Sequence, residues 1–151
     1  EYGLSTMEGY KGCFDSDGDG VANFDDEFPQ DVTQWNDTDG DGFGDNIIGS
    51  DADDCVETFG TSTELELLGC VDSDGDGYGD VVDALPNEST QWSDSDNDGY
   101  GDNPDGAEGD DCVLTYGTSH IDRLGCPDND NDKKMCTMCK YLIFIYLKFN
   151  Q

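Results

Sequence analysis

Hydrophobic positions are sparse along most of the chain and follow neither periodicity of regular secondary structure. Through residues 1–132 no helical apolar pattern lasts beyond about two turns, and Gly, Asp, Asn and Pro interrupt every segment. The best helical signal is TSTELELLG, where Thr61 or Ser62 would cap the N-terminus and Gly69 would end the helix. Strand signals are no stronger. We therefore expect a mostly irregular fold with little regular secondary structure.

The polar residues, by contrast, repeat with a period of 57 residues. Asp15 returns as Asp72, and Trp35 returns as Trp92. Each repeat holds two acidic loops, a proline-marked connector between them that ends in TQW, and a segment bounded by cysteines. The period divides the chain into the end of a truncated repeat (1–13), two full repeats (14–70 and 71–126), and an aborted loop with a non-repeat tail (127–151).

The cysteines follow the same period. Two of them, Cys55 and Cys70, lie near the start and at the end of residues 53–70, and Cys112 and Cys126 lie likewise in residues 110–126; we call these ranges the closing segments. This placement predicts the disulfides Cys55–Cys70 and Cys112–Cys126, while Cys13 would have lost its partner to the truncation. Longer pairings, such as Cys13 with Cys55, are the alternative.

Charge narrows the possible partners. The chain carries 37 acidic and 6 basic residues, for a net charge of −31. All of the acids lie in residues 1–132, where Lys11 and Arg123 are the only bases. Such a surface opposes compaction and repels nucleic acids and anionic membranes, so cations are the natural ligands. Seven cysteines in a loop-rich chain indicate an oxidising compartment and a secreted or cell-surface protein, and no apolar run is long enough to span a bilayer.

Each acidic loop has the pattern D-x-D-x-D-G of a calcium loop. Alternate carboxylates would turn inward around one ion, the sixth-position glycine would make the sharp turn, and the seventh residue would offer its carbonyl. Only hard oxygen ligands are available, with six or more per site, which favours Ca²⁺ over Zn²⁺ or copper. Mg²⁺ would fit less well because it demands tighter octahedral geometry and retains water. The ligands expected from positions one, three, five, seven and nine are Asp15, Asp17, Asp19, Val21 and Asn23 in loop one; Asp37, Asp39, Asp41, Phe43 and Asp45 in loop two; Asp72, Asp74, Asp76, Tyr78 and Asp80 in loop three; and Asp94, Asp96, Asp98, Tyr100 and Asp102 in loop four.

The twelfth position separates the loops into two kinds. Loops one and three have Asp26 and Asp83 there, where a bidentate ligand would sit. Loops two and four lack a common acid at that position. The later acids of these two loops would complete their sites or join a second ion, and the candidates are Asp51 and Glu108, and Asp53 and Asp110 with their neighbours Asp54 and Asp111.

Loops one and three, DSDGDGVANFDD and DSDGDGYGDVVD, resemble the thrombospondin type 3 repeat family. The resemblance implies an elongated, mostly irregular chain wrapped around rows of bound calcium and stapled by disulfides, which acts as an extracellular spacer or adhesive stalk. The missing twelfth acid in loops two and four and the TQW connectors depart from the animal pattern, and the arrangement looks more like arrays in microbial surface proteins. A calcium sensor of EF-hand type is not expected, because amphipathic flanking helices are missing and position eight is Ala or Gly.

Other features carry less information. The sequons NDT at Asn36 and NES at Asn87 are candidate glycosylation sites, with chance occurrence as the alternative. Trp35 and Trp92 are interpreted as structural, packing on Pro29 or Pro86 and the neighbouring disulfide. No catalytic constellation is present, so an enzyme is not expected. A fifth loop aborts at Lys133, and the basic tail beyond it contains a strand-prone run over 141–147.

The sequence thus predicts a calcium-dependent, disulfide-stapled repeat that serves as a rigid stalk or spacer of a secreted or surface protein and contacts neighbouring repeats of the same chain. One alternative is a subunit of an extracellular filament or adhesive fibre, assembled through rows of aromatic residues or through the strand-prone tail. Another is a non-catalytic spacer within an exported hydrolase or adhesin.

Overall fold

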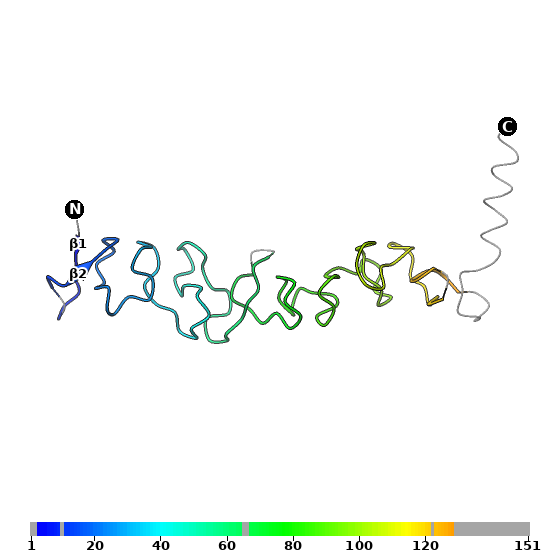
Figure 1. Cartoon of the computed structure of the whole chain (residues 1–151), viewed down its shortest axis with the longest axis horizontal. Helices are drawn as coiled ribbons and strands as arrows, with labels where there is room; N and C mark the ends of the chain where they lie inside the picture. The colour runs from blue at the N-terminus through cyan, green and yellow to red at the C-terminus, as the bar shows by residue number, and fades with distance from the viewer. Residues whose placement is uncertain (1–2, 10, 65–66, 122, 129–151) are drawn as a thin grey trace, which may run out of the picture. The chain divides into compact units, whose positions relative to one another are not determined.

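The computed structural model of the chain describes residues 3–9, 11–64, 67–121 and 123–128. Within this part the only strands are β1 (Gly3–Leu4) and β2 (Phe14–Asp15), which pair antiparallel with Gly3 opposite Asp15. None of these residues is helical, and the backbone otherwise runs through turns and bends (Figure 1). The predicted fold class, mostly irregular with little regular secondary structure, is confirmed in this coarse form.

The short helix expected over residues 61–69 is not found in its described parts, 61–64 and 67–69. The backbone N–H groups of Thr61 and Ser62 donate to the carbonyl of Cys70, at 2.9 and 3.1 Å. The hydroxyl of Ser62 donates to the Leu67 carbonyl at 2.6 Å and accepts from the Cys70 N–H at 2.9 Å. The prediction was wrong because the chain folds back on itself here. Ser62 bonds to Leu67 and Cys70 across this turn instead of capping a helix.

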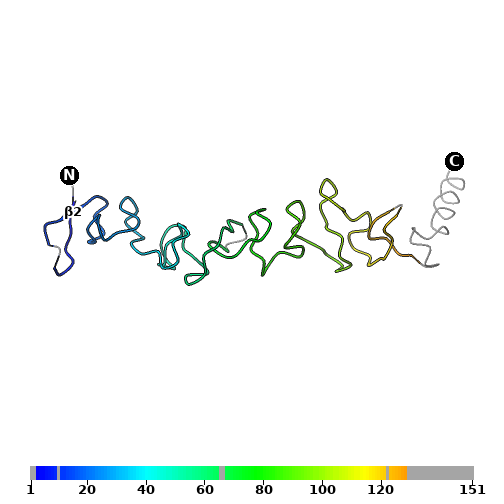
Figure 2. The same cartoon turned by 60° about the horizontal axis from the view of Figure 1, so that its bottom comes forward.

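The chain divides into two compact units, Glu1–Val81 and Val82–Gln151. The first contains loops one and two and the aspartate triplet of loop three, and the second contains loop four. Figure 2 shows the same succession of irregular loops along the backbone from a second direction. Within the described residues, no helix is long and apolar enough to cross a membrane.

Each unit is held together by polar contacts more than by apolar packing. The buried apolar residues of the described part are Val21, Ala22, Cys70 and Cys126. Polar residues fill most of the other buried positions, and the largest of them are Gln34 and Gln91, which are 1% and 0% exposed. Since buried polar groups cost free energy unless they are hydrogen-bonded, a core of this kind depends on complete pairing.

Gln34 meets this requirement. Its amide nitrogen donates to the carbonyls of Asn46 and Ser50, at 3.1 and 2.8 Å, and its amide oxygen accepts from the Asn46 N–H at 3.0 Å. Gln91 makes the same three bonds one repeat later, with Asn103 and Ala107. The glutamine of each TQW connector therefore anchors the chain that follows the next acidic loop.

Both predicted disulfides, Cys55–Cys70 and Cys112–Cys126, are formed, each with a Cα–Cα distance of 5.1 Å. Cys13 is a free thiol, as the repeat phase predicted. The closing segments fold back tightly at the second cysteine. A Cβ atom at Gly60 would lie 2.0 Å from the carbonyl carbon of Cys70, and Gly117 has the same relationship to Cys126. Only glycine allows this approach between the two arms of the closing segment.

Candidate metal centres

Three aspartates converge at the first, third and fifth positions of every acidic loop. In each triplet, one carboxylate oxygen per residue can be chosen so that all three lie within 4.8 Å of one another. The side chains are partly or fully buried, and Asp15 is 1% exposed. The four triplets are Asp15–Asp17–Asp19, Asp37–Asp39–Asp41, Asp72–Asp74–Asp76 and Asp94–Asp96–Asp98.

The first aspartate of each loop organises the backbone around itself. In loop two, Asp37 Oδ1 accepts from the N–H of Gly40 at 2.7 Å, and Asp37 Oδ2 accepts from the N–H of Gly42 at 3.0 Å. Gly40 and Gly42 have φ of 83° and 99°, a region in which glycine is free of strain. The other loops repeat both bonds, with first aspartates Asp15, Asp72 and Asp94.

The third and fifth positions leave carboxylate oxygens without partners. Asp19 Oδ1 accepts from the Val21 N–H at 2.7 Å, but its Oδ2 is buried with no hydrogen bond. Buried anionic oxygens of this kind are costly unless a cation or a donor satisfies them. The same is true at positions three or five of every loop, with unpartnered oxygens on Asp17, Asp19, Asp39, Asp74, Asp76 and Asp96. The triplets therefore fit a cation that is held by hard oxygen ligands.

Loop one has a fourth carboxylate, Asp26, at its twelfth position, and its role as a ligand stays a prediction. Asp26 is 7% exposed, and its Oδ1 accepts from the Phe28 N–H at 2.7 Å. Burial raises the pKa of Asp26, that hydrogen bond partly offsets the rise, and the charges of Asp19 and Asp17 raise it further. Its carboxylate thus lies in the electrostatic field of the triplet.

Asp83 repeats the local turn of Asp26. It is 9% exposed and accepts from the Leu85 N–H at 2.7 Å. Asp83 belongs to the second unit, whereas the triplet of loop three belongs to the first. Its role as the twelfth-position ligand stays a prediction.

In loop two the nearby fourth carboxylate comes from the closing segment. Asp53 is 2% exposed, and its Oδ2 has no hydrogen-bond partner. Burial raises the pKa of Asp53, a hydrogen bond from Cys55 partly offsets the rise, and the charges of Asp41 and Asp39 add to it. Asp53 therefore faces the loop-two carboxylates, although sixteen residues separate it from Asp37.

Loop four is built in the same way. Asp110 is 4% exposed, and its Oδ2 has no hydrogen-bond partner. Burial raises the pKa of Asp110, a hydrogen bond from the Cys112 N–H partly offsets the rise, and the charges of Asp98 and Asp96 add to it. The fourth carboxylates of loops two and four are thus equivalent in the two repeats.

The other candidates for loops two and four, Asp51 and Glu108, have exposed side chains. Both adopt positive φ, 43° and 49°. Glu108 raises the pKa of the Tyr100 hydroxyl, second to the effect of burial and ahead of the charge of Asp98. The structure therefore brings Asp53 and Asp110 toward the triplets as buried groups, whereas Asp51 and Glu108 face solvent.

The ninth-position side chains make contacts that the calcium-loop pattern did not predict. In loop two, Asp45 accepts from the backbone N–H of Thr38 at 3.0 Å and from its hydroxyl at 2.7 Å. Asp80 and Asp102 bind Ser73 and Ser95 in the same way, and Asn23 binds Ser16. The available signal was the Ser or Thr at position two of all four loops.

This contact between positions two and nine closes each loop and satisfies its ninth side chain. Burial alone would raise the pKa of Asp45, but hydrogen bonds from Thr38 and Asn36 lower it overall. Asp102 has a lowered pKa for the same reason, with Ser93 and Ser95 as the donors. Coordination by the ninth position and by the carbonyls of Val21, Phe43, Tyr78 and Tyr100 stays a prediction.

The two sequons differ in their surroundings. The amide nitrogen of Asn36 donates to Asp45 and, at 3.2 Å, to the hydroxyl of Thr38. Ser93, one repeat later, donates to Asp102 from the same position. Both asparagines are exposed, but the Asn36 side chain has a structural role in loop two through these hydrogen bonds. Glycosylation of either residue stays a prediction.

The tryptophans are partly exposed, Trp35 by 43% and Trp92 by 38%. Trp35 lines a hollow of about 550 Å³ together with Met7 and Val21. Its backbone carbonyl accepts from the Glu27 N–H at 3.3 Å. Trp35 thus lies beside the seventh residue of loop one.

A scan against protein-family models found none that matches the chain, and a comparison with curated proteins found no similar sequence.

Proposed function

We propose that this chain is a calcium-binding structural repeat of a secreted or cell-surface protein, and that it serves as a stalk or spacer that calcium makes rigid. One observation carries the proposal. Buried carboxylate oxygens without hydrogen-bond partners recur at the same positions of four loops in two repeats. Such oxygens need a cation, and their number and hardness suit Ca²⁺, which takes six to eight oxygen ligands.

In this mechanism, calcium coordination by the carboxylates replaces their mutual repulsion. Without ions, 37 acidic residues repel one another in a chain that has a very small apolar core. An ion that binds only the folded loop stabilises the folded state by mass action, so the binding free energy becomes folding free energy. Extracellular modules bind calcium with dissociation constants of about 10⁻⁴–10⁻³ M, which suits a repeat that becomes rigid outside cells.

Two further observations support a calcium-dependent spacer in a secreted or cell-surface protein. The disulfides Cys55–Cys70 and Cys112–Cys126 indicate a non-cytoplasmic protein. The motif resemblance of loops one and three to thrombospondin type 3 repeats agrees with a calcium-dependent spacer.

The experiment is a calcium titration of the intact, disulfide-bonded chain, followed by far-UV circular dichroism and small-angle X-ray scattering. We expect a compact, ordered chain in millimolar calcium and an expanded one in EDTA, with magnesium much less effective. Unchanged spectra and scattering between calcium and EDTA would overturn the proposal.

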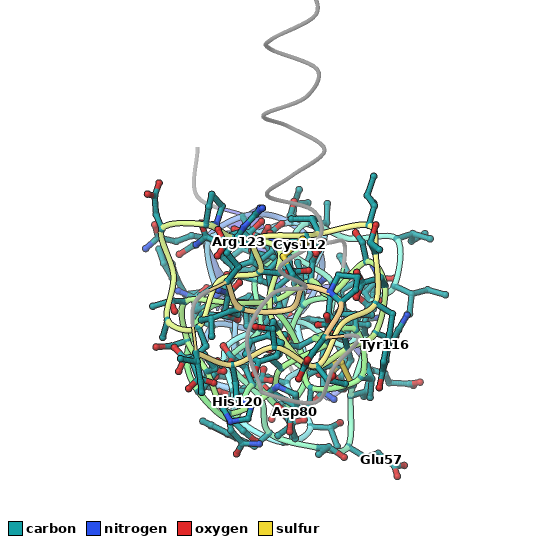
Figure 3. All side chains as sticks on the ribbon, turned by 90° about the vertical axis from the view of Figure 1, so that its right-hand side faces the viewer. Glu57, Asp80, Cys112, Tyr116, His120 and Arg123 are labelled. Carbon is teal, nitrogen blue, oxygen red and sulfur yellow. A yellow bond between two sulfur atoms is a disulfide. The ribbon has the colours of Figure 1, made fainter. Side chains whose placement is uncertain are left out.

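The exposed apolar side chains favour a second candidate, a subunit of an extracellular filament. Ile47 and Ile48, at the end of loop two, are 79% and 87% exposed, and Leu114 in the second closing segment is 82% exposed. Tyr116, which Figure 3 labels, is 61% exposed. The strand-prone run over 141–147 lies outside the described residues. Sedimentation velocity with and without calcium separates the candidates, because only a filament subunit would form large calcium-dependent species.

A further inference from the structure

The candidate sites differ in how much of the chain is needed to build them. In loop one, the triplet and Asp26 lie within twelve consecutive residues, 15–26. In loop two, Asp53 lies beyond the twelfth position, Ile48, and it comes just before the closing-segment cysteine Cys55. The fourth carboxylate of loop two is therefore placed by a different part of the fold.

Asp53 is held between the acidic loop and the first closing-segment cysteine. Its Oδ1 accepts from the Cys55 N–H at 2.6 Å, and its own N–H donates to the Gly44 carbonyl at 2.9 Å. Its Oδ2, buried and without a partner, is left for an ion. The disulfide begins two residues after Asp53, at Cys55.

The other arm of the closing segment covers the same carboxylates. A Cβ atom at Gly69 would lie 2.3 Å from Asp53 Oδ1 and 2.9 Å from Asp41 Oδ2, so both carboxylates lie against the Gly69 backbone. The Gly60 N–H also donates to Asp41 Oδ2, at 3.2 Å. The Cys55–Cys70 disulfide joins the arm that carries Asp53 to the end of the arm that carries Gly69.

Loop four repeats these contacts within the second unit. The Cys112 N–H donates to Asp110 Oδ1 at 2.6 Å. A Cβ atom at Gly125 would lie 2.1 Å from the same oxygen. The Gly117 N–H donates to Asp98 Oδ2 at 3.0 Å. Figure 3 labels Arg123, which reinforces this segment by donating to the Asp111 carbonyl at 2.9 Å.

We infer that the disulfide-linked closing segment is part of the ion site of loops two and four, with Asp53 and Asp110 as ligands held in place by Cys55–Cys70 and Cys112–Cys126. Loop one is independent of both disulfides. This inference depends on the proposed calcium binding and specifies how two of the four sites are assembled. Without the cross-link, ion binding must also order the closing segment, and that entropy cost lowers the affinity.

The sixth-position glycines allow each loop to be followed separately. The backbone N–H groups of Gly20, Gly42 and Gly99 donate to the first aspartate of loops one, two and four. Their ¹H–¹⁵N NMR shifts should therefore report calcium binding loop by loop in the intact chain.

The first experiment compares the double variant C55S/C70S with the native chain in such a titration. We expect the calcium midpoint of Gly42 to rise by about tenfold or more, as for the loss of groups that orient a metal ligand. The midpoints of Gly20 and Gly99 should change less than about twofold, because their loops do not use this disulfide. In C112S/C126S the midpoint of Gly99 should rise instead. Equal changes in all loops, or no change in Gly42, would overturn the inference.

The second experiment keeps both disulfides and tests the ligand itself. Asp53→Asn removes one charge from a buried side chain, and Asp51→Asn removes one from an exposed side chain two residues away. We expect D53N to raise the Gly42 midpoint by about tenfold or more and D51N to leave it nearly unchanged. If D53N behaves like D51N, the inference is wrong. If no glycine of the native chain responds to calcium, the proposed function itself fails.

Discussion

The side-chain amide of Gln34 lies against the backbone of Gly44, so closely that a Cβ atom at residue 44 would lie 2.1 Å from Gln34 Cδ. Gln91 and Gly101 have the same relationship one repeat later, at 2.2 Å. A fully hydrogen-bonded polar side chain thus occupies the place that an apolar residue takes in the core of an ordinary domain. The fold of each repeat therefore contains this packed pair as well as a disulfide.

Gln34→Ala should destabilise the calcium-loaded protein strongly. The substitution leaves the Asn46 N–H and the carbonyls of Asn46 and Ser50 without their partner. Buried groups left unpaired cost about 1–3 kcal/mol each, so we expect a loss of about 2–4 kcal/mol after partial hydration. Urea unfolding in saturating calcium measures the change, with the exposed Gln30→Ala as control. Equal stability of the two variants would show that the Gln34 bonds do not hold the repeat together.

Gly44→Ala should destabilise the folded protein, because the added methyl group overlaps Gln34. The effects of Gly44→Ala and Gln34→Ala on stability should therefore not be additive. The added methyl group needs the space that the Gln34 side chain occupies. In the Q34A background this space is free, so G44A should cost much less there than in the native chain. A double-mutant cycle from urea unfolding measures the coupling, which we expect to exceed about 1 kcal/mol. Full additivity would contradict the close packing of this pair.

The fourth residue of each loop has a left-handed backbone conformation, and it is glycine in three loops and asparagine in the fourth. Gly18, Gly40 and Gly75 have φ of 81–88° there, and loop four has Asn97 at φ 62°. Nothing lies within 4 Å of a Cβ atom built at Gly40, so a substitution meets only conformational cost. Gly40→Ala should cost about 1 kcal/mol and weaken calcium binding by loop two, because alanine disfavours this region.

Gly40→Asn is the matched control, since asparagine adopts left-handed backbone more readily. We expect its calcium midpoint, followed at Gly42, to lie between those of the native chain and G40A. A larger loss for asparagine than for alanine would mean that the side chain, and not the backbone, decides the cost.

Local spacing was enough to predict the aspartate triplets and both disulfides. The D-x-D-x-D-G pattern determines which carboxylates converge, because the loop's own backbone binds its first aspartate. The cysteine pairs follow from the repeat period because each pair encloses one short fold-back. These features involve residues that are close together in the sequence.

The sequence could not choose between Asp51 and Asp53 as the fourth carboxylate of loop two. Both are acids at plausible spacing, and the choice depends on Gly60 and Gly69, whose backbone folds back over Asp53 and Asp41. Gln34 was missed for a related reason, since a polar residue is not expected in a core and its partners lie 12 to 16 residues further on. Long-range backbone contacts decide both cases.

A change of pH should act in opposite directions on the stability of the ion-free and the calcium-loaded protein. Burial, together with neighbouring carboxylates, raises the pKa of Asp26, Asp53 and Asp110. A carboxyl with a raised folded-state pKa binds protons more tightly when folded. Its contribution to stability is complete below the unfolded pKa of about 3.9 and is lost as pH rises through the folded value. The pKa is also raised at Asp19, Asp76 and Asp96. Hydrogen bonds lower the pKa of Asp31, Asp45 and Asp102, which oppose this trend but are fewer.

The ion-free protein should therefore become more stable to urea as the pH falls from about 7 toward about 4. In saturating calcium the protons compete with the ion for the same carboxylates, so stability should fall over the same range. Urea midpoints at several pH values, measured in calcium-stripped and calcium-containing buffer, provide the comparison. The variant D53N/D110N removes two of the groups with raised pKa and should flatten the ion-free curve. If the urea midpoint changed with pH in the same direction in both buffers, protons and calcium would not compete for these carboxylates.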